Sequence, residues 1–156
     1  MNHLPVTWSW KAFAELTAAE LYAALKLRSA VFVVEQACAF LDMDDCDQSC
    51  WHLLGWCGTE LIAYLRLVPP GIKYAEASIG RVINATSVRG TGVGKQLFAE
   101  GVREAERRFP GQPLRIGAQS YLERFYGDFG FVRVGEPYME DGILHLEMVR
   151  EAKLPT

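Results

Sequence analysis

The chain has 156 residues, a formal net charge of −3 and an ordinary globular composition, with 50% hydrophobic and 22% charged residues. This composition argues against disorder, and 16 basic against 19 acidic residues argue against a domain that binds a nucleic-acid backbone. The apolar runs are shorter than the roughly 20 residues that a membrane span needs, and residues 1–5 lack the features of a signal peptide. We therefore expect one domain over residues 1–156, located in the cytoplasm, with neither nucleic acid nor a membrane as its partner.

Hydrophobic patterns predict the elements of the first half of the chain. Thr17 and Glu20 have the spacing of a capping box, which predicts a helix from about residue 18 to about residue 34. The acidic stretch 38–50 is predicted to be a loop. Strands are predicted at 6–12, 51–57, 60–68 and 77–83.

The second half continues the mixture of helices and strands. A helix is predicted at 91–109, with an apolar stripe and a charged face, and a shorter one at 121–129, which Gly130 ends. Strands are predicted at 114–118, 131–134 and 144–150. The resulting order, β-α-β-β-β-α-β-α-β-β, predicts an α/β mixture around one sheet.

Four cysteines lie close together in the sequence: Cys38, Cys46, Cys50 and Cys57. In a cytoplasmic chain of this size we expect free thiols rather than a disulfide framework. A structural zinc site that includes His52 is the alternative, but the spacing contains no Cys-x-x-Cys pair, so we expect no metal.

The most informative segment is the glycine-rich turn between Arg89 and Lys95, which follows a predicted strand and opens the second long helix. Glycines allow the backbone to approach a ligand closely, and the start of a helix presents free amides and a partial positive charge. Together these features favour binding of a pyrophosphate. A turn that binds no ligand is the structural alternative.

Two familiar phosphate-binding loops do not fit this turn. The nucleoside-triphosphate loop needs four residues between its first glycine and its Gly-Lys pair, but Gly90 and Gly94 are separated by three, and Gln96 follows the lysine. The dinucleotide fingerprint would need glycine at the position of Lys95. A small nucleotide-binding domain is therefore disfavoured.

The turn instead resembles the acyl-CoA signature of the GNAT N-acetyltransferase superfamily, Arg-x-x-Gly-x-Gly. Arg89, Gly92 and Gly94 occupy its positions, with Gly90 as the usual accessory glycine. A second superfamily motif, Asn-x6-Tyr-x3-Gly-Phe, is matched with Gln119 in place of the asparagine. The remaining positions of that motif are Tyr126, Gly130 and Phe131.

The resemblance narrows to the ElaA-like subgroup and covers residues 6–150. The chain departs from the subgroup at Asn84, where an apolar residue is usual, and at Cys46 and Cys50, which are not part of the pattern. The segments that carry the similarity are Leu27-Arg28, Val31-Phe32-Val33-Val34-Glu35-Gln36, Cys38, Asp44-x-x-Asp47, Trp51-His52, Ile79-Gly80-Arg81-Val82, Ala118-Gln119 and Asp141-Gly142-Ile143-x-His145-x-x-Met148.

This resemblance implies the acyl-CoA N-acyltransferase fold, a single mixed and mostly antiparallel sheet flanked by helices. It implies transfer of an acetyl group from acetyl-CoA, as cosubstrate, to a primary amine on a small molecule or a peptide, and it is compatible with a homodimer. Gln119 is expected to contact the pantetheine arm, and Tyr126 to protonate the leaving thiolate. The expected cofactor-binding backbone comprises Val82, Ile83, Asn84, Arg89, Gly90, Thr91, Gly92, Val93, Gly94 and Lys95.

The general base is left open by the sequence. A lysine-like amine has a pKa of about 10.4, so its neutral form costs about 4–5 kcal/mol at pH 7. Glu35 is the first candidate, although a capping role or an ion pair with Arg28 or Arg81 is an equally good interpretation of this residue. The other residues expected on the substrate side are Arg28, Asp44, His52, Arg81 and His145.

Each of these candidates has a plainer structural reading. A histidine on a strand is more often hydrogen-bonded than catalytic. The aspartates of residues 42–47 are either solvated or face the site, in which case they would favour a cationic amine. A non-catalytic module that binds acyl-CoA is the alternative function, although such a module would not need Tyr126.

Overall fold

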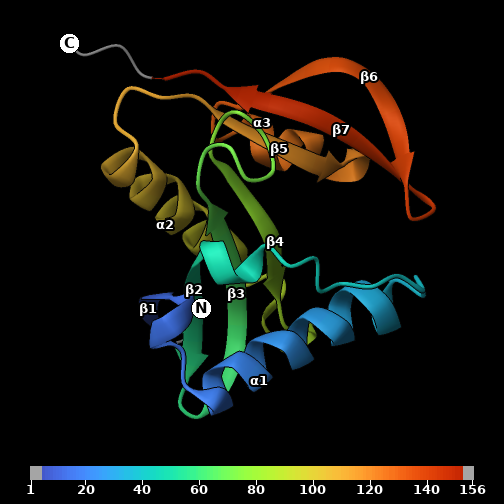
Figure 1. Ribbon diagram of the computed structural model, residues 1–156. Coiled ribbons are helices and arrows are strands. Elements are labelled where there is room, and N and C mark those ends of the chain that lie inside the picture. The colour runs from blue at the N-terminus through green and yellow to red at the C-terminus, as the bar shows by residue number, and fades with distance from the viewer. Residues whose placement is uncertain (1–4, 153–156) are drawn as a thin grey trace.

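The computed structural model describes residues 5–152, which form two groups of antiparallel strands with helices packed against them (Figure 1). The helical segments are η1 (Phe13–Glu15), α1 (Ala18–Arg28), the π-helix η2 (Ser29–Glu35), η3 (Asp47–Ser49), η4 (Thr86–Val88), α2 (Val93–Arg108), η5 (Ser120–Leu122) and α3 (Glu123–Gly127). The strands are β1 (Thr7–Ala12), β2 (Trp51–Cys57), β3 (Glu60–Val68), β4 (Ser78–Asn84), β5 (Leu114–Gln119), β6 (Val132–Glu140) and β7 (Ile143–Arg150).

Within residues 5–152, a single bridge joins the two strand groups, at the point where β4 and β5 begin. One group has the order β1-β2-β3-β4 and the other the order β5-β7-β6. A parallel bridge between Ala77 and Leu114 joins them, and the Arg115 amide donates to the Ala77 carbonyl at 3.0 Å. Beyond this bridge β4 and β5 form no ladder within the described residues, so the edge of each strand that faces the other remains free. The expected mixture of helices and mostly antiparallel strands is confirmed, but the single sheet that was expected is divided at this point into two groups.

Helices cover both faces of the first strand group (Figure 1). Neighbouring residues on a strand point to opposite faces, so Leu53 and Leu65 pack with α2, whereas Leu54 and Tyr64 pack with α1. The α2 side forms the larger core. Its helical members are Val93, Leu97, Phe98, Val102 and Ala105.

The start of the predicted first helix is confirmed, but its last part is a π-helix rather than an α-helix. The Thr17 side chain accepts from the Glu20 amide at 3.1 Å, and the Glu20 carboxylate accepts from the Thr17 amide at 2.8 Å, which is the expected capping box. After Arg28 the helix continues as η2, a wider π-helical turn of a kind that often lies at functional sites. This continuation carries Glu35 and the adjacent Gln36 to the free edge of β4.

A bulge interrupts β4. Tyr64 pairs with Ile83 and Arg66 with Gly80, so two residues of β4, Arg81 and Val82, lie opposite one residue of β3. Arg81 has a φ of 53°, in the left-handed region that a long side chain rarely adopts. A bulge bends its strand, and this one lies where β4 separates from β5.

The C-terminal hairpin is longer than predicted. Strand β6 continues to Glu140 rather than ending at residue 134, because a sheet edge tolerates the Gly135 and Pro137 that interrupt the pattern. Asp141 and Gly142, with φ of 50° and 77°, form the tight turn to β7. The helix predicted at 121–129 is shorter, since residues 120–122 are a 3-10 turn and α3 ends at Gly127.

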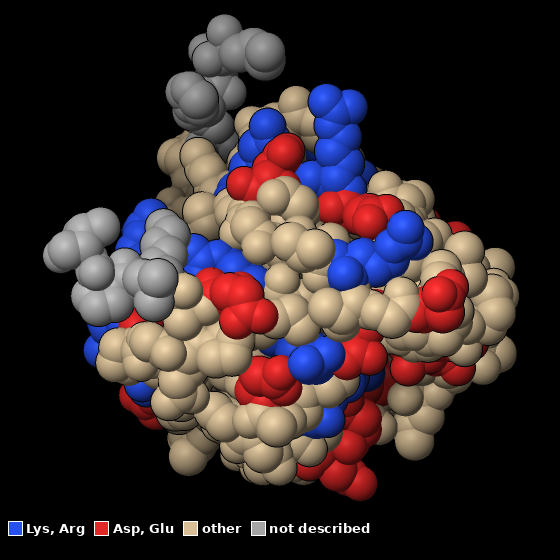
Figure 2. Space-filling model, turned by 90° about the horizontal axis from the view of Figure 1, so that it is seen from above, with Lys and Arg blue, Asp and Glu red and all other residues tan. Residues whose placement is uncertain are grey.

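Basic and acidic side chains are interspersed on the face shown in Figure 2, in agreement with the small net charge. No helix within residues 5–152 is long and apolar enough to cross a membrane.

The close packing of α2 on β3 depends on Gly101, and this can be tested. A Cβ at this position would lie 2.9 Å from Leu65 Cδ2. We expect Gly101→Val to lower the free energy of unfolding by about 1–3 kcal/mol, because the core is already filled. Gly127→Val, where a Cβ would meet nothing within 4 Å, is the matched control for urea denaturation. Equal stability of the two variants would contradict this packing.

Candidate active site

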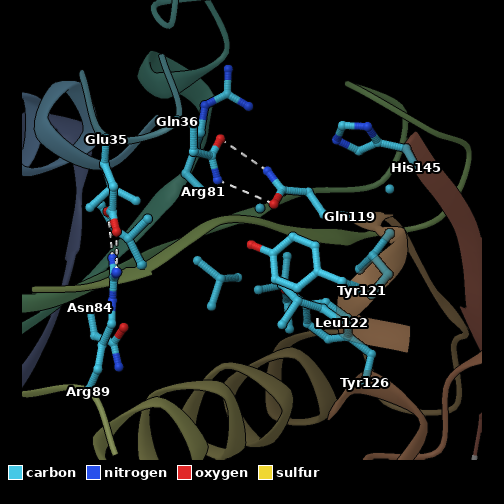
Figure 3. A pocket seen from close by; sticks show the side chains of 17 residues that line it. Glu35, Gln36, Arg81, Asn84, Arg89, Gln119, Tyr121, Leu122, Tyr126 and His145 are labelled. Atoms are coloured by element: carbon cyan, nitrogen blue, oxygen red, sulfur yellow. Dashed lines mark hydrogen bonds and ion pairs between the residues drawn. The ribbon is translucent and has the colours of Figure 1, made fainter. Parts of the chain in front are cut away.

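A cavity of about 600 Å³, here called cavity A, lies where β4 and β5 separate (Figure 3). The inner edge of β4 forms one wall, and β5, η5 and α3 form the other. The end of η2 and the start of the glycine turn close one end. The lining residues are Val31, Glu35, Gln36, Ile79, Gly80, Arg81, Val82, Ile83, Asn84, Arg89, Ile116, Gly117, Gln119, Tyr121, Leu122, Tyr126 and His145.

The glycine turn presents the start of α2 beside cavity A. Gly90 and Gly92 have φ of 79° and 87°, so they adopt a backbone that other residues avoid, and Gly92 is the N-cap of α2. The amides of the first helical turn have no carbonyl partner within the helix and can bind an anion. Gly90–Lys95 do not line cavity A itself. Gly94 lines a smaller cavity of about 170 Å³, which shares Val82, Ile83, Asn84, Leu122 and Tyr126 with cavity A.

Glu35 and Arg89 form an ion pair across one end of cavity A (Figure 3). Arg89 donates twice to the Glu35 carboxylate, with an Nη2–Oε2 distance of 2.7 Å. The hydrogen bond from Arg89 lowers the pKa of Glu35. The sequence anticipated an arginine partner for Glu35, but proposed Arg28 or Arg81. The partner is Arg89, and a carboxylate held in this way is a weak base.

Tyr126 is buried between α2 and the second strand group, and it lines both cavity A and the smaller cavity. Its ring meets that of Phe98 edge to face, with 5.0 Å between centroids. No hydrogen bond joins its hydroxyl to another residue within 5–152, so the hydroxyl is available to a ligand. Burial and, to a smaller extent, the neighbouring Tyr121 raise the pKa of the Tyr126 phenol, which keeps it protonated at neutral pH.

A second cavity of about 260 Å³, here called cavity B, adjoins cavity A. The two share Gln36, Arg81, Gln119 and His145. The Gln36 and Gln119 side-chain amides hydrogen-bond to each other at 3.2 and 3.3 Å, a bridge between η2 and β5 at the border of the cavities (Figure 3). The other residues that line cavity B are Phe32, Cys38, Phe40, Leu41, Asp44, Lys73, Glu140, Asp141 and Ile143.

The His145 side chain is largely buried at the shared wall of the two cavities. Its Nδ1 lies 2.8 Å from the Ile143 carbonyl oxygen. A carbonyl only accepts, so Nδ1 carries the proton and the neutral ring has its lone pair on Nε2. Nε2 lies 3.6 Å from the Glu140 carboxylate, which would stabilise a protonated ring. His145 also stacks on Tyr138, with 5.7 Å between centroids.

The acidic loop is held by buried arginines. Asp42 and Asp47 are 5% and 7% exposed, so the interpretation as a solvated loop is wrong for both of them. Arg28 binds Asp42 at 2.8 Å and Asp47 at 2.9 Å. Arg66 binds Asp47 at 2.8 Å and Asp44 at 2.5 Å. Three aspartates are thus neutralised by three arginines, the third being Arg81, which binds Asp42 at 2.7 Å.

This network separates the expected substrate-side residues into two groups. Arg81, Asp44 and His145 line a cavity, whereas Arg28 and His52 line neither cavity A nor cavity B. His52 is buried, with Nδ1 2.6 Å from the Tyr64 hydroxyl and Nε2 2.9 Å from the Asp47 carbonyl oxygen. Burial lowers the pKa of His52, which favours its neutral form and a structural role.

The four cysteines are free thiols. Burial raises the pKa of Cys50 to about 12, and its thiol donates to the Cys46 carbonyl at 3.1 Å. The Cys38 thiol, which lines cavity B, donates to the Asp141 carbonyl at 3.0 Å. Within residues 5–152 no three of the His, Cys, Asp and Glu side chains are grouped as metal ligands would be.

Sequence reasoning did not single out Gln36, Tyr121 or Lys73. Gln36 stands inside a segment that carried the family resemblance, but its role depends on Gln119, which is 83 positions away. The Tyr121 ring points into cavity A (Figure 3). Tyr121 lies two residues after Gln119, at the end of a predicted strand, and this position could have indicated that it belongs to the site. Nothing in the pattern around Lys73 marked it.

The chain is similar to known proteins in both sequence and fold. The Acetyltransferase (GNAT) domain matches residues 58–152. Protein ElaA of Escherichia coli is 42% identical over 148 residues, which are 94% of this chain and 97% of ElaA. The UPF0039 protein sll0451 of Synechocystis is 40% identical over 147 residues, covering 94% of this chain and 96% of its own.

Two solved structures share both sequence and fold with this chain. An acyl-CoA N-acyltransferase from Pseudomonas aeruginosa superposes with a TM-score of 0.90 and 42% identity, covering 94% of this chain and 99% of its own. The crystal structure of Escherichia coli ElaA superposes with a TM-score of 0.89 and 41% identity, covering 94% of this chain and 100% of the ElaA chain.

The buried ion network predicts a dependence of stability on charge. Burial opposes ionisation of Asp47, but Arg28 and Arg66 outweigh it and lower the pKa of Asp47. We expect Asp47→Asn to lower the free energy of unfolding by about 3 kcal/mol at pH 7, because two buried guanidinium groups lose a shared counter-charge. Asp45→Asn is the matched control, since Asp45 is exposed and its φ of 63° suits asparagine.

The pH dependence follows from the same carboxylate. A depressed pKa in the folded state stabilises the protein above the unfolded-state pKa of about 3.9, and this contribution is lost as pH falls through the folded-state value. The difference in stability between wild type and Asp47→Asn should therefore shrink below about pH 4. A constant difference from pH 7 to pH 3 in urea denaturation would contradict the network.

Proposed function

The chain belongs to the GNAT family of acyl-CoA-dependent acyltransferases, and on this basis we propose that it is an N-acetyltransferase, which moves the acetyl group of acetyl-CoA to a primary amine by direct attack. The observation that carries the proposal is the free edge of β4, which has the start of α2 at one end and the hydroxyl of Tyr126 at its side.

We propose that this edge and the glycine turn bind the cosubstrate. The backbone of Val82, Ile83 and Asn84 is free on the side that faces cavity A and can hydrogen-bond the pantetheine arm. The amides of Arg89–Lys95 would hold the pyrophosphate. Arg89, held by Glu35, would add its positive charge beside the phosphates.

The reaction needs two proton movements. The amine nitrogen attacks the thioester carbon, a C–N bond forms, the C–S bond breaks and the electron pair leaves on sulfur. We propose that the phenol of Tyr126 hydrogen-bonds that sulfur, because its hydroxyl lines cavity A. Because its pKa is raised above the ordinary value of about 10, whereas a thiol has a pKa of about 8.5, we expect donation to the thiolate to contribute more than complete transfer of the proton.

The amine must also lose a proton, and His145 is the base that we propose. Its lone pair on Nε2 lies at the wall shared by the two cavities, and Glu140 can stabilise the charge that it gains. Glu35 remains the alternative from the sequence. Its pairing with Arg89 and its lowered pKa make it the weaker base, so we assign it to holding Arg89.

A non-catalytic acyl-CoA-binding module is the second candidate function. The arrangement of Tyr126 and His145 favours the enzyme, because a module that only binds would need neither a free phenol nor a histidine with an available lone pair.

Release of free thiol from acetyl-CoA, measured across a panel of primary amines, tests the proposal. We expect turnover with at least one amine and a reduction in kcat of about 100-fold in Tyr126→Phe, because one donor to the leaving group is lost. The KM for acetyl-CoA should change little. Tyr22→Phe, at an exposed position on α1, is the control and should match wild type.

Two results would count against parts of this proposal. Binding of acetyl-CoA in isothermal titration without turnover of any amine would favour the binding module. A Tyr126→Phe variant as fast as wild type would remove Tyr126 from the mechanism.

The role of His145 predicts a change in the pH profile. We expect His145→Gln to lower kcat by about 100-fold, with unchanged affinity for acetyl-CoA in titration. In this variant kcat/KM should follow only the deprotonation of the amine in solution. A variant that keeps the wild-type profile would show that another group is the base.

A further inference from the structure

Cavity B lies beside the proposed site of acyl transfer, and apart from Gln119 its lining has no part in binding acetyl-CoA as described above. We infer that cavity B binds the acceptor, and that this acceptor is a compact zwitterion, a primary amine that also carries a carboxylate. The inference rests on the proposed function and specifies the substrate class for that same site.

The position and the size of cavity B suit a small acceptor. It shares its wall with cavity A through Gln36, Gln119 and His145, so a molecule bound in it could reach the thioester. Its volume of about 260 Å³ lies below the range of about 300–1,000 Å³ that is usual for drug-sized ligands. A molecule the size of an amino acid fits this space better than a folded protein surface.

One side of cavity B suits an amine. His145 presents Nε2 there, 3.6 Å from the Glu140 carboxylate, and the acidic residue Asp141 lines the cavity at the same β6–β7 turn. An ammonium group would be attracted to these carboxylates. It would then lose its proton to His145, next to the thioester.

The acidic loop adds little net charge to cavity B. Asp44 lines the cavity, but Arg66 binds its carboxylate with two hydrogen bonds, at 2.8 and 2.5 Å. Arg81 also lines it and is paired with Asp42 at 2.7 Å. The expectation that these aspartates would attract a cationic acceptor therefore does not follow from the structure, because the arginines neutralise them.

The opposite charge comes from Lys73, on the loop between β3 and β4. Lys73 lines cavity B and forms no ion pair or hydrogen bond with another residue in the described part of the chain. Desolvation lowers the pKa of its amine, and the positive charges of Arg81 and Arg66 add to this effect, against the weaker opposite influence of Asp44 and Glu140. A carboxylate on the ligand would supply the counter-charge that Lys73 lacks.

Cavity B thus presents carboxylates and a base on one side and an unpaired cation in its lining. A zwitterion satisfies both features. A diamine would place its second cation near Lys73 and Arg81, which disfavours it.

Matched pairs of amines with and without a carboxylate test this inference. Suitable pairs are phenylalanine and phenethylamine, lysine and cadaverine, and 4-aminobutyrate and propylamine. Rates are corrected for the neutral fraction of each amine. We expect kcat/KM to be at least about tenfold higher for the carboxylate-bearing member of the preferred pair. Lys73→Met should abolish this preference, and Lys73→Arg should retain it.

Lys26→Met, at an exposed position on α1, is the matched control and should leave the preference unchanged. A preference for amines without a carboxylate, or a preference for carboxylates that persists in Lys73→Met, would overturn the inference while the transferase activity stands. Binding of acetyl-CoA with no turnover of any member of the panel would also overturn it. Failure of acetyl-CoA to bind would instead overturn the proposed function.

Discussion

The bulge in β4 is the constraint on which the rest of the site depends. Arg81 adopts a left-handed backbone that costs on the order of 1 kcal/mol for a non-glycine residue. Its guanidinium binds the Asp42 carboxylate at 2.7 Å and the Asp42 carbonyl at 2.8 Å, contacts that offset the strain. With the bulge held, β4 turns away from β5 after the Ala77 bridge, and the free strand edge, cavity A and the proximity of Tyr126 follow.

The same ion network determines which polar side chains are paired within the protein and which can act on a ligand. Buried arginines neutralise the carboxylates of Asp42, Asp44 and Asp47 by ion pairing. The acidic loop therefore contributes to the shape of the site but adds little net charge to it. The groups left to act on ligands are those without a buried partner. Tyr126 has a free hydroxyl, and His145 has a lone pair directed by a backbone carbonyl.

Local patterns were sufficient for most of the fold, since β2, β3, β7 and α2 lie within two residues of their predicted bounds. The glycine turn and the Tyr126 motif could also be recognised in the sequence, because the residues of each motif lie close together along the chain. What the sequence could not show depends on distant partners. Glu35 meets Arg89 across 54 positions and Arg28 meets Asp47 across 19, and no local pattern specifies such pairs. The π-helical end of the first helix also went unforeseen, because its apolar residues suit several conformations.

A crystal structure of the protein with CoA tests the central claim most directly. We predict that the pantetheine arm lies between β4 and β5 and accepts and donates hydrogen bonds at the backbone of residues 82–84. The thiol should lie beside the Tyr126 hydroxyl, and the pyrophosphate should lie at the amides that begin α2. A CoA molecule bound elsewhere, or one whose thiol is remote from Tyr126, would contradict it.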